Sequence, residues 1–323
     1  MFIGIIGPLC AGKHSVAKWL VSKGFVYLGL NQREHAGLET LLFDKDEDIL
    51  NHVTEHWLQN FVTCDIESMR TLEIFNKRPF FMLIAVDSPM SLRYVRYVNR
   101  CRETNHNEPT IEEFMAQSDD ELYKTAYSTA FNKNMQETTI HTNLNNHSRL
   151  QYLETPIINL MQMADLNVVN SYDSLTSLYS CLHKLDIVNA ERLRPSWDTY
   201  FMRMSDLAAS RSNCMKRKVG CILVKDSRVV ATGYNGTPRG LKNCNEGGCR
   251  RCNDAVPCGV GLDVCLCLHA EENALLEAGR GRVANGFGVK EVVYNLSYGM
   301  DDETAEIFEE AGVKLRQHSA NNH

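Results

Sequence analysis

The chain has 323 residues, a formal net charge of -6 and 12 cysteines. Its length suffices for two domains that each bury a hydrophobic core. Its acidic balance, with a pI near 6.0, offers no basic face, so we expect no polynucleotide partner; a mononucleotide, whose phosphate needs only one or two nearby cations, stays open.

The N-terminal residues Phe2–Ile6 form an apolar run that predicts a buried strand. The run has neither a basic leader nor a small-residue cleavage pattern, and no segment approaches the charge-free length that spans a membrane. We therefore expect a soluble protein without a membrane partner, located in the cytoplasm, with the nucleus open as a second location.

Residues 1–185 alternate apolar runs with amphipathic segments, which is the pattern of strands and helices in a parallel sheet. We expect strands at 2–6, 80–86 and 164–170, and helices at 15–22, 92–99 and 174–185. The polar segment 103–148 is expected to be a lid or a surface excursion. Residues 186–195 are the expected linker, so the domains are placed at 1–185 and 196–323.

The first strand is followed by Gly7-Pro-Leu-Cys-Ala-Gly12-Lys13-His14, a glycine-rich turn that leads into a helix. Such a turn surrounds phosphate oxygens with backbone N–H groups, and we expect Gly7, Gly12 and Lys13 to bind a nucleotide. The position that should carry a magnesium-binding hydroxyl is occupied by His14. The motif therefore favours a P-loop kinase-like fold more than it favours phosphoryl transfer.

The sequence pattern of the second domain also predicts an α/β fold. Its apolar periodicity predicts helices at 197–208, 269–278 and 302–310, and strands at 221–224, 229–232, 291–295 and 313–316. A charged turn at 225–228 joins the first two of these strands.

Half of the cysteines fall in one short stretch that is rich in Gly and Asn: Cys244, Cys249, Cys252, Cys258, Cys265 and Cys267. In a chain without a secretory signal, such clustering indicates metal binding more than disulfides. Cys249 and Cys252 have the two-residue spacing of ligand pairs in structural zinc sites. The alternative, a set of small buried hydrophobic side chains, suits this polar stretch less well.

The segment His269-Ala-Glu271 lies at the start of a predicted helix. A lone His and Glu at that place are usually solvated side chains favoured by the helix dipole. In zinc deaminases, however, this pair is half of the active site: the His is a zinc ligand and the Glu moves a proton of the zinc-bound water. The turn Gly233-Tyr-Asn235-Gly236, which could present an amide to a pyrimidine, raises the odds of the second interpretation.

With Arg194-Pro-Ser-Trp197-Asp and Arg211-Ser-Asn-Cys214-Met-Lys-Arg-Lys218-Val-Gly220 added to these motifs, residues 194–282 resemble the deoxycytidylate (dCMP) deaminase family, in particular fungal members with a kinase-like N-terminal extension. The resemblance implies a cytidine-deaminase α/β/α fold and zinc-dependent hydrolytic deamination of dCMP to dUMP. It also implies a homohexamer, with dCTP as activator and dTTP as inhibitor, each with Mg2+.

The resemblance assigns roles to individual residues. It implies His269 as a ligand of catalytic Zn2+, Glu271 as the proton shuttle, and Asn235, Arg280 and Tyr298 as substrate-binding residues. Arg280 and Tyr298 have plainer alternatives, a helix-dipole partner and packing at a strand end. For a second, structural zinc the candidate ligands are Cys214, Cys244, Cys249, Cys252 and Cys265, and the choice of four among them stays open.

One part of the family pattern is missing. After His269 the chain has no cysteine, so the Pro-Cys-x-x-Cys motif that supplies two further zinc ligands is absent. Residues 280–289 run directly into Lys290-Glu-Val-Val-Tyr294, as if one strand and one helix had been removed in a single excision. Cys265 and Cys267 precede His269 on its loop side, and Cys258 has no second cysteine at the required spacing, so none of them replaces the missing pair.

We therefore expect a P-loop kinase-like parallel sheet followed by a deaminase-like α/β/α domain that lacks one strand-helix unit and exposes sheet edges. The leading hypothesis is a mis-spliced or wrongly predicted product of a dCMP deaminase gene that releases no ammonia from dCMP. A catalytically dead isoform comes second, and a regulatory partner third. The alternatives in function are a nucleotide-binding or kinase-like protein acting through Lys13 and, against the acidic balance, a polynucleotide deaminase.

Overall fold

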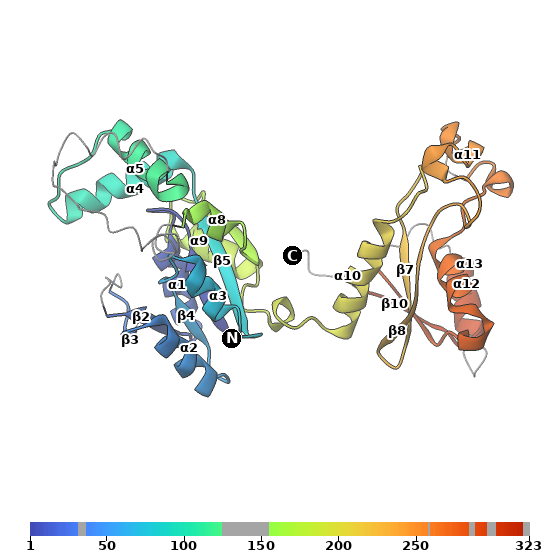
Figure 1. Cartoon of the computed structure of the whole chain (residues 1–323), viewed down its shortest axis with the longest axis horizontal. Coiled ribbons are helices and arrows are strands. Elements are labelled where there is room, and N and C mark those ends of the chain that lie inside the picture. The colour runs from blue at the N-terminus through green and yellow to red at the C-terminus, as the bar shows by residue number, and fades with distance from the viewer. Residues whose placement is uncertain (32–36, 125–154, 258, 284–287, 296–301, 319–323) are drawn as a thin grey trace, which may run out of the picture. The chain divides into compact units, whose positions relative to one another are not determined.

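The computed structural model describes residues 1–323 except 32–36, 125–154, 258, 284–287, 296–301 and 319–323. The chain divides into two compact units, Met1–Leu193 and Arg194–His323, and each is described by itself (Figure 1). The break between them falls within the segment 186–195. Among the described residues no helix has the length and apolar character needed to cross a membrane.

Unit 1 is built on a six-stranded parallel sheet with the order β3-β2-β4-β1-β5-β6, so the expected parallel α/β architecture is confirmed. The strands are β1 Phe2–Ile6, β2 Val26–Leu30, β3 Thr40–Phe43, β4 Phe61–Thr63, β5 Phe81–Asp87 and β6 Leu166–Val169. The helices are α1 Lys13–Val21, α2 Asp46–Glu55, α3 Met69–Phe75, α4 Met90–Glu103, α5 Ile111–Tyr123, α8 Ile157–Met161 and α9 Leu175–Lys184, and the short 3-10 turn η1 is Ala190–Arg192.

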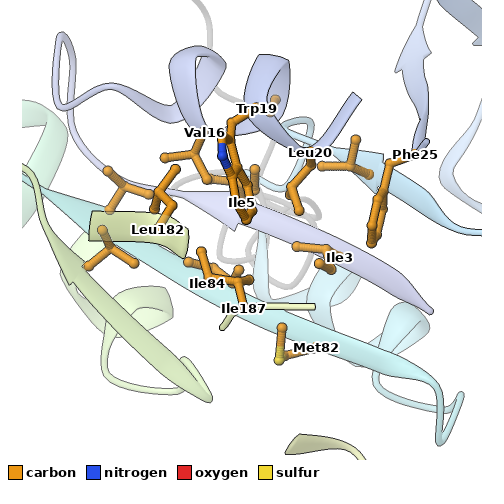
Figure 2. Close-up of a cluster of buried hydrophobic side chains, with 14 of the residues drawn as sticks. Ile3, Ile5, Val16, Trp19, Leu20, Phe25, Met82, Ile84, Leu182 and Ile187 are labelled. Atoms are coloured by element: carbon orange, nitrogen blue, oxygen red, sulfur yellow. The ribbon is translucent and has the colours of Figure 1, made fainter. Parts of the chain in front are cut away.

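The central strand β1 is buried along its whole length because helices cover both faces of the sheet. Its side chains alternate between two apolar clusters. Ile3 and Ile5 pack with Trp19 of α1 in one cluster (Figure 2). Phe2 packs with Phe75 in the other, with ring centroids 5.0 Å apart. Unit 1 therefore has a complete hydrophobic core of its own.

The segment 103–148, expected as a lid or surface excursion, contains the helix α5. Its first turn is fixed by a capping box, in which the Thr110 side chain and the Glu113 side chain each accept a backbone N–H of the other residue. The remainder of the excursion from residue 125 lies outside the described residues.

Unit 2 contains short elements and two separate sheets. Its helices are α10 Trp197–Ala209, α11 Arg250–Asn253, α12 Ala270–Val283 and α13 Asp302–Glu310, and its 3-10 turns are η2 Cys244–Glu246 and η3 Leu262–Val264. Its strands are β7 Gly220–Lys225, β8 Arg228–Tyr234, β9 Glu291–Tyr294 and β10 Lys314–Gln317. The strands β7 and β8 pair antiparallel, and β9 and β10 pair parallel.

Helices α10 and α12 cover opposite faces of the β7–β8 pair (Figure 1). A Cβ at Gly220 would lie 1.9 Å from the backbone oxygen of Ser205 in α10, whereas a Cβ at Gly233 would lie 2.0 Å from that of Ala270 in α12. Cys221 is directly opposite Gly233, so its side chain shares the α12 face. The two glycines therefore allow the close packing that gives this unit its three layers.

The expected loss of one strand-helix unit has a visible consequence in the sheet. Within the described residues no strand joins the β7–β8 pair to the β9–β10 pair, so each strand of unit 2 keeps one edge without a strand partner. The unit also lacks a large apolar core: its buried apolar side chains, among those described, are Ala231, Ala270, Ala274, Ala278 and three cysteines. Large apolar side chains are exposed instead, with Leu207 71% and Leu276 67% accessible.

Candidate functional site

His269 directly precedes α12, and Glu271 lies in the first turn of that helix. Both side chains are exposed. The helix start is held against β8 by Asn273, whose backbone N–H donates to the His269 carbonyl (3.0 Å) and whose Nδ2 donates to the Tyr234 carbonyl (2.8 Å). The structure therefore positions the His-x-Glu pair on a fixed helix terminus above the β7–β8 pair.

The turn that carries Asn235 lies beside this helix start. Gly236 and Leu268 exchange two backbone hydrogen bonds, N to O distances of 3.3 and 2.8 Å, in an isolated antiparallel bridge. This bridge brings the turn next to His269, although Asn235 and His269 are 34 positions apart in the chain. The fold thus places the Asn235 turn and the start of the His-x-Glu helix side by side.

The Asn235 side chain is buried and largely used within the protein. Its Oδ1 accepts from the Val219 backbone N–H (2.8 Å) and from the Ser212 hydroxyl (2.7 Å), and its Nδ2 donates to the Arg217 carbonyl (2.9 Å). These contacts hold the 212–219 loop against the turn. One Nδ2 hydrogen is all the donor capacity that remains for a substrate.

The structure describes the other two predicted substrate-binding residues, Arg280 and Tyr298, only in part or not at all. Arg280 belongs to α12 and directly follows Gly279, whose φ of 68° and ψ of 160° break the helical geometry. Tyr298 lies outside the described residues. Their proposed contact with substrate phosphate therefore stays a prediction.

Cys221 of β7 marks the environment of Glu271. Burial raises the pKa of the Cys221 thiol to about 11, and the negative charge of Glu271 adds to the increase. The Cys221 thiol is only partly exposed, and it lies on the α12 face of β7, the face that carries the helix to which Glu271 belongs.

The residues around His269 do not fit a catalytic zinc ion. Such an ion takes three protein ligands and keeps one position for water. Within the described residues, every set of neighbouring side chains that could hold a metal consists of cysteines alone, and none includes His269 or Glu271. Cys265 and Cys267, the cysteines nearest to His269 in sequence, both belong to those cysteine sets.

The cysteines form one compact cluster, which we call the thiol cluster: Cys214, Cys244, Cys249, Cys252, Cys265 and Cys267. It contains all five cysteines that the sequence proposed for structural zinc and adds Cys267. The loop between α10 and β7 contributes Cys214. Cys244 lies in η2, Cys249 and Cys252 lie at the N-cap of α11 and within it, and Cys265 and Cys267 lie in the segment that leads to α12. The sequence signal for Cys267 was its spacing of one residue from Cys265.

Hydrogen-bond donors surround these sulfur atoms. Met215 N–H donates to Cys244 Sγ and Lys216 N–H to Cys214 Sγ, both at 3.4 Å. Around Cys249, burial opposes ionisation, but backbone N–H groups and neighbouring thiols outweigh burial and lower its pKa to about 6. Burial, together with neighbouring thiols, raises the pKa values of Cys252 and Cys267, so without a metal the surroundings favour a thiolate at Cys249 and not at these two cysteines.

Unit 1 has a pocket of about 390 Å³ at the glycine-rich turn. Cationic side chains on its wall are Lys13, Arg96 and Arg100, and residues 8–10 and 12–15 of the turn also line it. A side chain at Gly7 would place its Cβ 1.9 Å from the Val86 carbonyl oxygen, and the φ of 150° there also disfavours other residues. The turn therefore packs its backbone closely against β5.

The pocket is already held together by protein groups. Arg96 donates to the carbonyl oxygens of Cys10 (3.2 Å) and Tyr172 (2.6 Å). The Leu9 backbone N–H donates to the Glu121 carboxylate of α5 at 2.7 Å. A carboxylate oxygen thus binds a backbone N–H of the glycine-rich turn, the type of donor that binds phosphate oxygens in P-loops.

Residues 195–296 match the family model described as cytidine and deoxycytidylate deaminase zinc-binding region. The deoxycytidylate deaminase of Schizosaccharomyces pombe is 42% identical, over 98% of this chain and 97% of the relative. That of Saccharomyces cerevisiae is 36% identical, over 99% and 97% respectively. The deoxycytidylate deaminase of Mycobacterium phage D29 is 48% identical over 93 residues, which are 27% of this chain and 70% of the phage protein.

The alignment with the Schizosaccharomyces pombe protein has 342 positions, more than the 323 residues of this chain, so at least 19 positions of that relative have no counterpart here. Over the remaining length the similarity extends through both units. The chain therefore belongs to the deoxycytidylate deaminase family.

Proposed function

We propose that this chain is a shortened product of a gene whose intact product hydrolytically deaminates dCMP to dUMP, for use in pyrimidine deoxynucleotide supply. The similarity along both units supports this origin. The retained His269-Ala-Glu271 helix start and the adjoining Asn235 turn support a deaminase site in the intact product. In that product His269 would be a ligand of catalytic zinc and Glu271 would move protons, with Asn235, Arg280 and Tyr298 toward the substrate.

We further propose that the chain in its present form does not catalyse the reaction. The observation that carries this proposal is the ligand count at His269. No cysteine follows Cys267 in the sequence, and among the described residues no group of three or more metal-binding side chains includes His269. A zinc ion at His269 would therefore not have the three protein ligands that a catalytic site requires, so we assign no hydrolytic step to this polypeptide.

The experiment that tests the proposed origin is sequencing of the messenger RNA across the codons for Arg282 to Gly288. An additional in-frame segment encoding Pro-Cys-x-x-Cys in the main transcript would support a deaminase gene with a shortened product. If every transcript reads straight through these codons, the gene encodes a deaminase relative without its catalytic metal, and the proposed origin is wrong.

The assembly of the intact product is proposed to be a homo-oligomer, a hexamer by analogy with the family, with dCTP and dTTP as effectors in complex with Mg2+. Exposed apolar side chains on α10 support a covering partner, because Trp197 is 58% and Leu207 71% accessible in the single chain. Light scattering after size-exclusion chromatography of the intact product tests this, and a monomer would contradict it.

A second function is favoured by the pocket in unit 1, and we propose that it binds a nucleotide phosphate without transferring it. Lys13, Arg96 and Arg100 supply positive charge around the glycine-rich turn. Transfer is not supported, since His14 occupies the position of the magnesium-binding hydroxyl.

Calorimetry with ATP and dCTP tests nucleotide binding. Lys13→Ala is expected to weaken binding at least tenfold, whereas Lys18→Ala, on the exposed side of the same helix, should leave it unchanged. Binding that is absent in the wild type, or equal in the two variants, would contradict this function. Measurement of nucleotide hydrolysis and phosphorylated product then separates binding from kinase chemistry.

A further inference from the structure

We propose that the thiol cluster binds two zinc ions as one binuclear centre, in which Cys252 and Cys267 bridge both metals. Cys214 and Cys244 would complete one site, and Cys249 and Cys265 the other. This goes beyond the single structural zinc that the sequence suggested, which would use four of five cysteines.

The number of cysteines and their grouping lead to this arrangement. The cluster consists of two sets of four cysteines, and within each set all four sulfur atoms lie within 4.8 Å of one another. The two sets share Cys252 and Cys267. Structural zinc takes four ligands in a tetrahedron. One zinc ion would leave two cysteines unused, and two independent sites would need eight, whereas two ions sharing two thiolates use all six.

The distances between sulfur atoms have the length that shared tetrahedra require. Zn–S bonds of about 2.3 Å place the sulfur atoms of one tetrahedron about 3.8 Å apart. The observed Sγ to Sγ separations are 3.9 Å for Cys249 and Cys265, 3.8 Å for Cys252 and Cys265, and 3.9 Å for Cys252 and Cys267. These separations are far too long for disulfides, whose S–S bonds are about 2.05 Å.

Cys252 has the contacts expected of a bridging ligand. Its sulfur lies 3.9 Å from that of Cys214, which belongs to one set, and 3.8 Å from that of Cys265, which belongs to the other. A terminal ligand would contact the ligands of its own metal only. Cys252 is also 5% exposed, so water does not compete for a position between the two metals.

The charge around the cluster is complementary to such a centre. Six thiolates and two Zn²⁺ ions leave a net charge of about -2, which nearby cations and N–H donors must balance. Arg251 is 8% exposed, and its guanidinium Nη1 lies 3.8 Å from Cys265 Sγ. No carboxylate in the described part of the chain forms an ion pair with Arg251. A buried cation needs an anionic partner, and ionised cysteines of the thiol cluster are the anionic groups next to Arg251.

The alternative, six neutral thiols acting as small apolar side chains, leaves the stability of this region unexplained. The elements that carry the cysteines are short: η2 and η3 have three residues each and α11 has four. Helical pieces of this length do not persist without tertiary support. No large apolar side chain of the described residues is buried in unit 2, so a metal centre is the component that can hold these pieces together.

The test uses the full chain, purified from cells grown with zinc and then exchanged with ¹¹³Cd. We expect two zinc ions per chain by elemental analysis. We expect two cadmium resonances, with the β protons of Cys252 and of Cys267 each coupled to both. One metal per chain, none, or two metals without a cysteine coupled to both would overturn the proposal.

Variants give a second measurement. Cys244→Ser removes a terminal ligand of one site and is expected to lower the zinc content from two ions to one. Cys252→Ser removes a bridge and should lower the content below that of Cys244→Ser. Cys221→Ser, in β7 and outside the cluster, serves as the matched control and should retain both ions.

His269→Ala separates this centre from the deaminase site. Because His269 belongs to neither cysteine set, the variant should keep both zinc ions. A loss of one ion in this variant would overturn the assignment of the bound zinc to the thiol cluster alone. Zinc content is measured independently of dCMP turnover, so the outcome does not depend on the proposed function.

Discussion

Asn235 has a structural role that its sequence motif did not indicate. The resemblance to the family implied only that it contacts the nucleotide, which stays a prediction. In the fold, its side chain makes three hydrogen bonds, to Ser212, Arg217 and Val219, that fix the turn against the 212–219 loop. The sequence could not predict these bonds, because their partners lie 16 to 23 residues away along the chain.

Replacement of Asn235 by Ala should therefore loosen the turn in this chain, whatever its effect on nucleotide. Removing three buried hydrogen bonds is expected to destabilise the turn locally by about 2–3 kcal/mol, since each bond contributes about 1 kcal/mol. The measurement is hydrogen exchange at the Val219 amide, which should lose protection. Asn235→Asp keeps both acceptor contacts and should lose less; equal protection in wild type and Asn235→Ala would contradict the structural role.

The sequence analysis did not include Cys267 among the candidate ligands of a structural zinc ion. Cys267 sits two positions before His269, in a stretch interpreted as the approach to the deaminase helix. Spacing along the chain cannot show which sulfur atoms meet when the ligands come from separate loops. Only the folded chain brings Cys214 and Cys267 within reach of Cys252, 38 and 15 residues away.

Among the elements of unit 1, apolar runs predicted three of the six strands. The runs at 2–6, 80–86 and 164–170 correspond to β1, β5 and β6, of which β1 and β5 are buried almost throughout. The sequence analysis did not predict β2, β3 and β4. Strand β4 has only three residues and depends on pairing with β1 and β2, and β3 is an edge strand whose two central side chains are exposed. Pairing partners rather than local pattern define such strands.

The β9–β10 pair is connected to the rest of unit 2 by an ion pair. Arg316 of β10 donates two hydrogen bonds to the Asp198 carboxylate at the start of α10, with Nη2 to Oδ1 at 3.0 Å. The Arg316 guanidinium, chiefly through these hydrogen bonds, lowers the pKa of Asp198. This contact links β10 to α10, the helix that packs on the β7–β8 pair.

The pH dependence of this link follows from the direction of the pKa shift. Because the pKa of Asp198 is lower in the folded state than in the unfolded state, its contribution is complete above the unfolded value, near pH 4, and declines as the pH falls through the folded value. Asp198→Asn should cost no more than about 1 kcal/mol at pH 7, because both partners are about a third exposed.

Urea unfolding of the wild type and Asp198→Asn at pH 7 and pH 3 measures this effect. The difference in unfolding free energy should shrink at pH 3. Asp206→Asn, on the same helix and without an ion pair among the described residues, is the control and should show no such pH dependence. A difference for Asp198→Asn that is unchanged at low pH would contradict the role of the ion pair.

At the scale of the whole molecule, the two units are stabilised by different means. Unit 1 buries large aliphatic and aromatic side chains on both faces of its sheet. The described part of unit 2 buries only alanines and cysteines among its apolar residues. The sequence predicted two α/β regions correctly from their periodicity. It could not show that the described part of the second region buries no large apolar side chain, since burial depends on which elements pack together.

Chelation of zinc should therefore affect unit 2 and leave unit 1 unchanged. Removing zinc from the full chain is expected to increase hydrogen exchange in 212–268 of unit 2 by at least tenfold, while exchange in β1 and β5 of unit 1 stays the same. Hydrogen exchange with mass spectrometry before and after chelation measures both units in one sample. Equal effects on both units, or no effect on either, would contradict the view that the thiol cluster maintains unit 2.

The chain belongs to the deoxycytidylate deaminase family, and we propose that it does not catalyse the reaction of that family because it has no complete set of zinc ligands at His269. This proposal is tested by measuring the formation of dUMP from dCMP by the purified full chain supplied with zinc, compared with Glu271→Gln. We expect the chain to form no more dUMP than Glu271→Gln does. Formation of dUMP by the chain that is abolished in Glu271→Gln would show a working site at His269 and Glu271, and the proposed loss of catalysis would then be wrong.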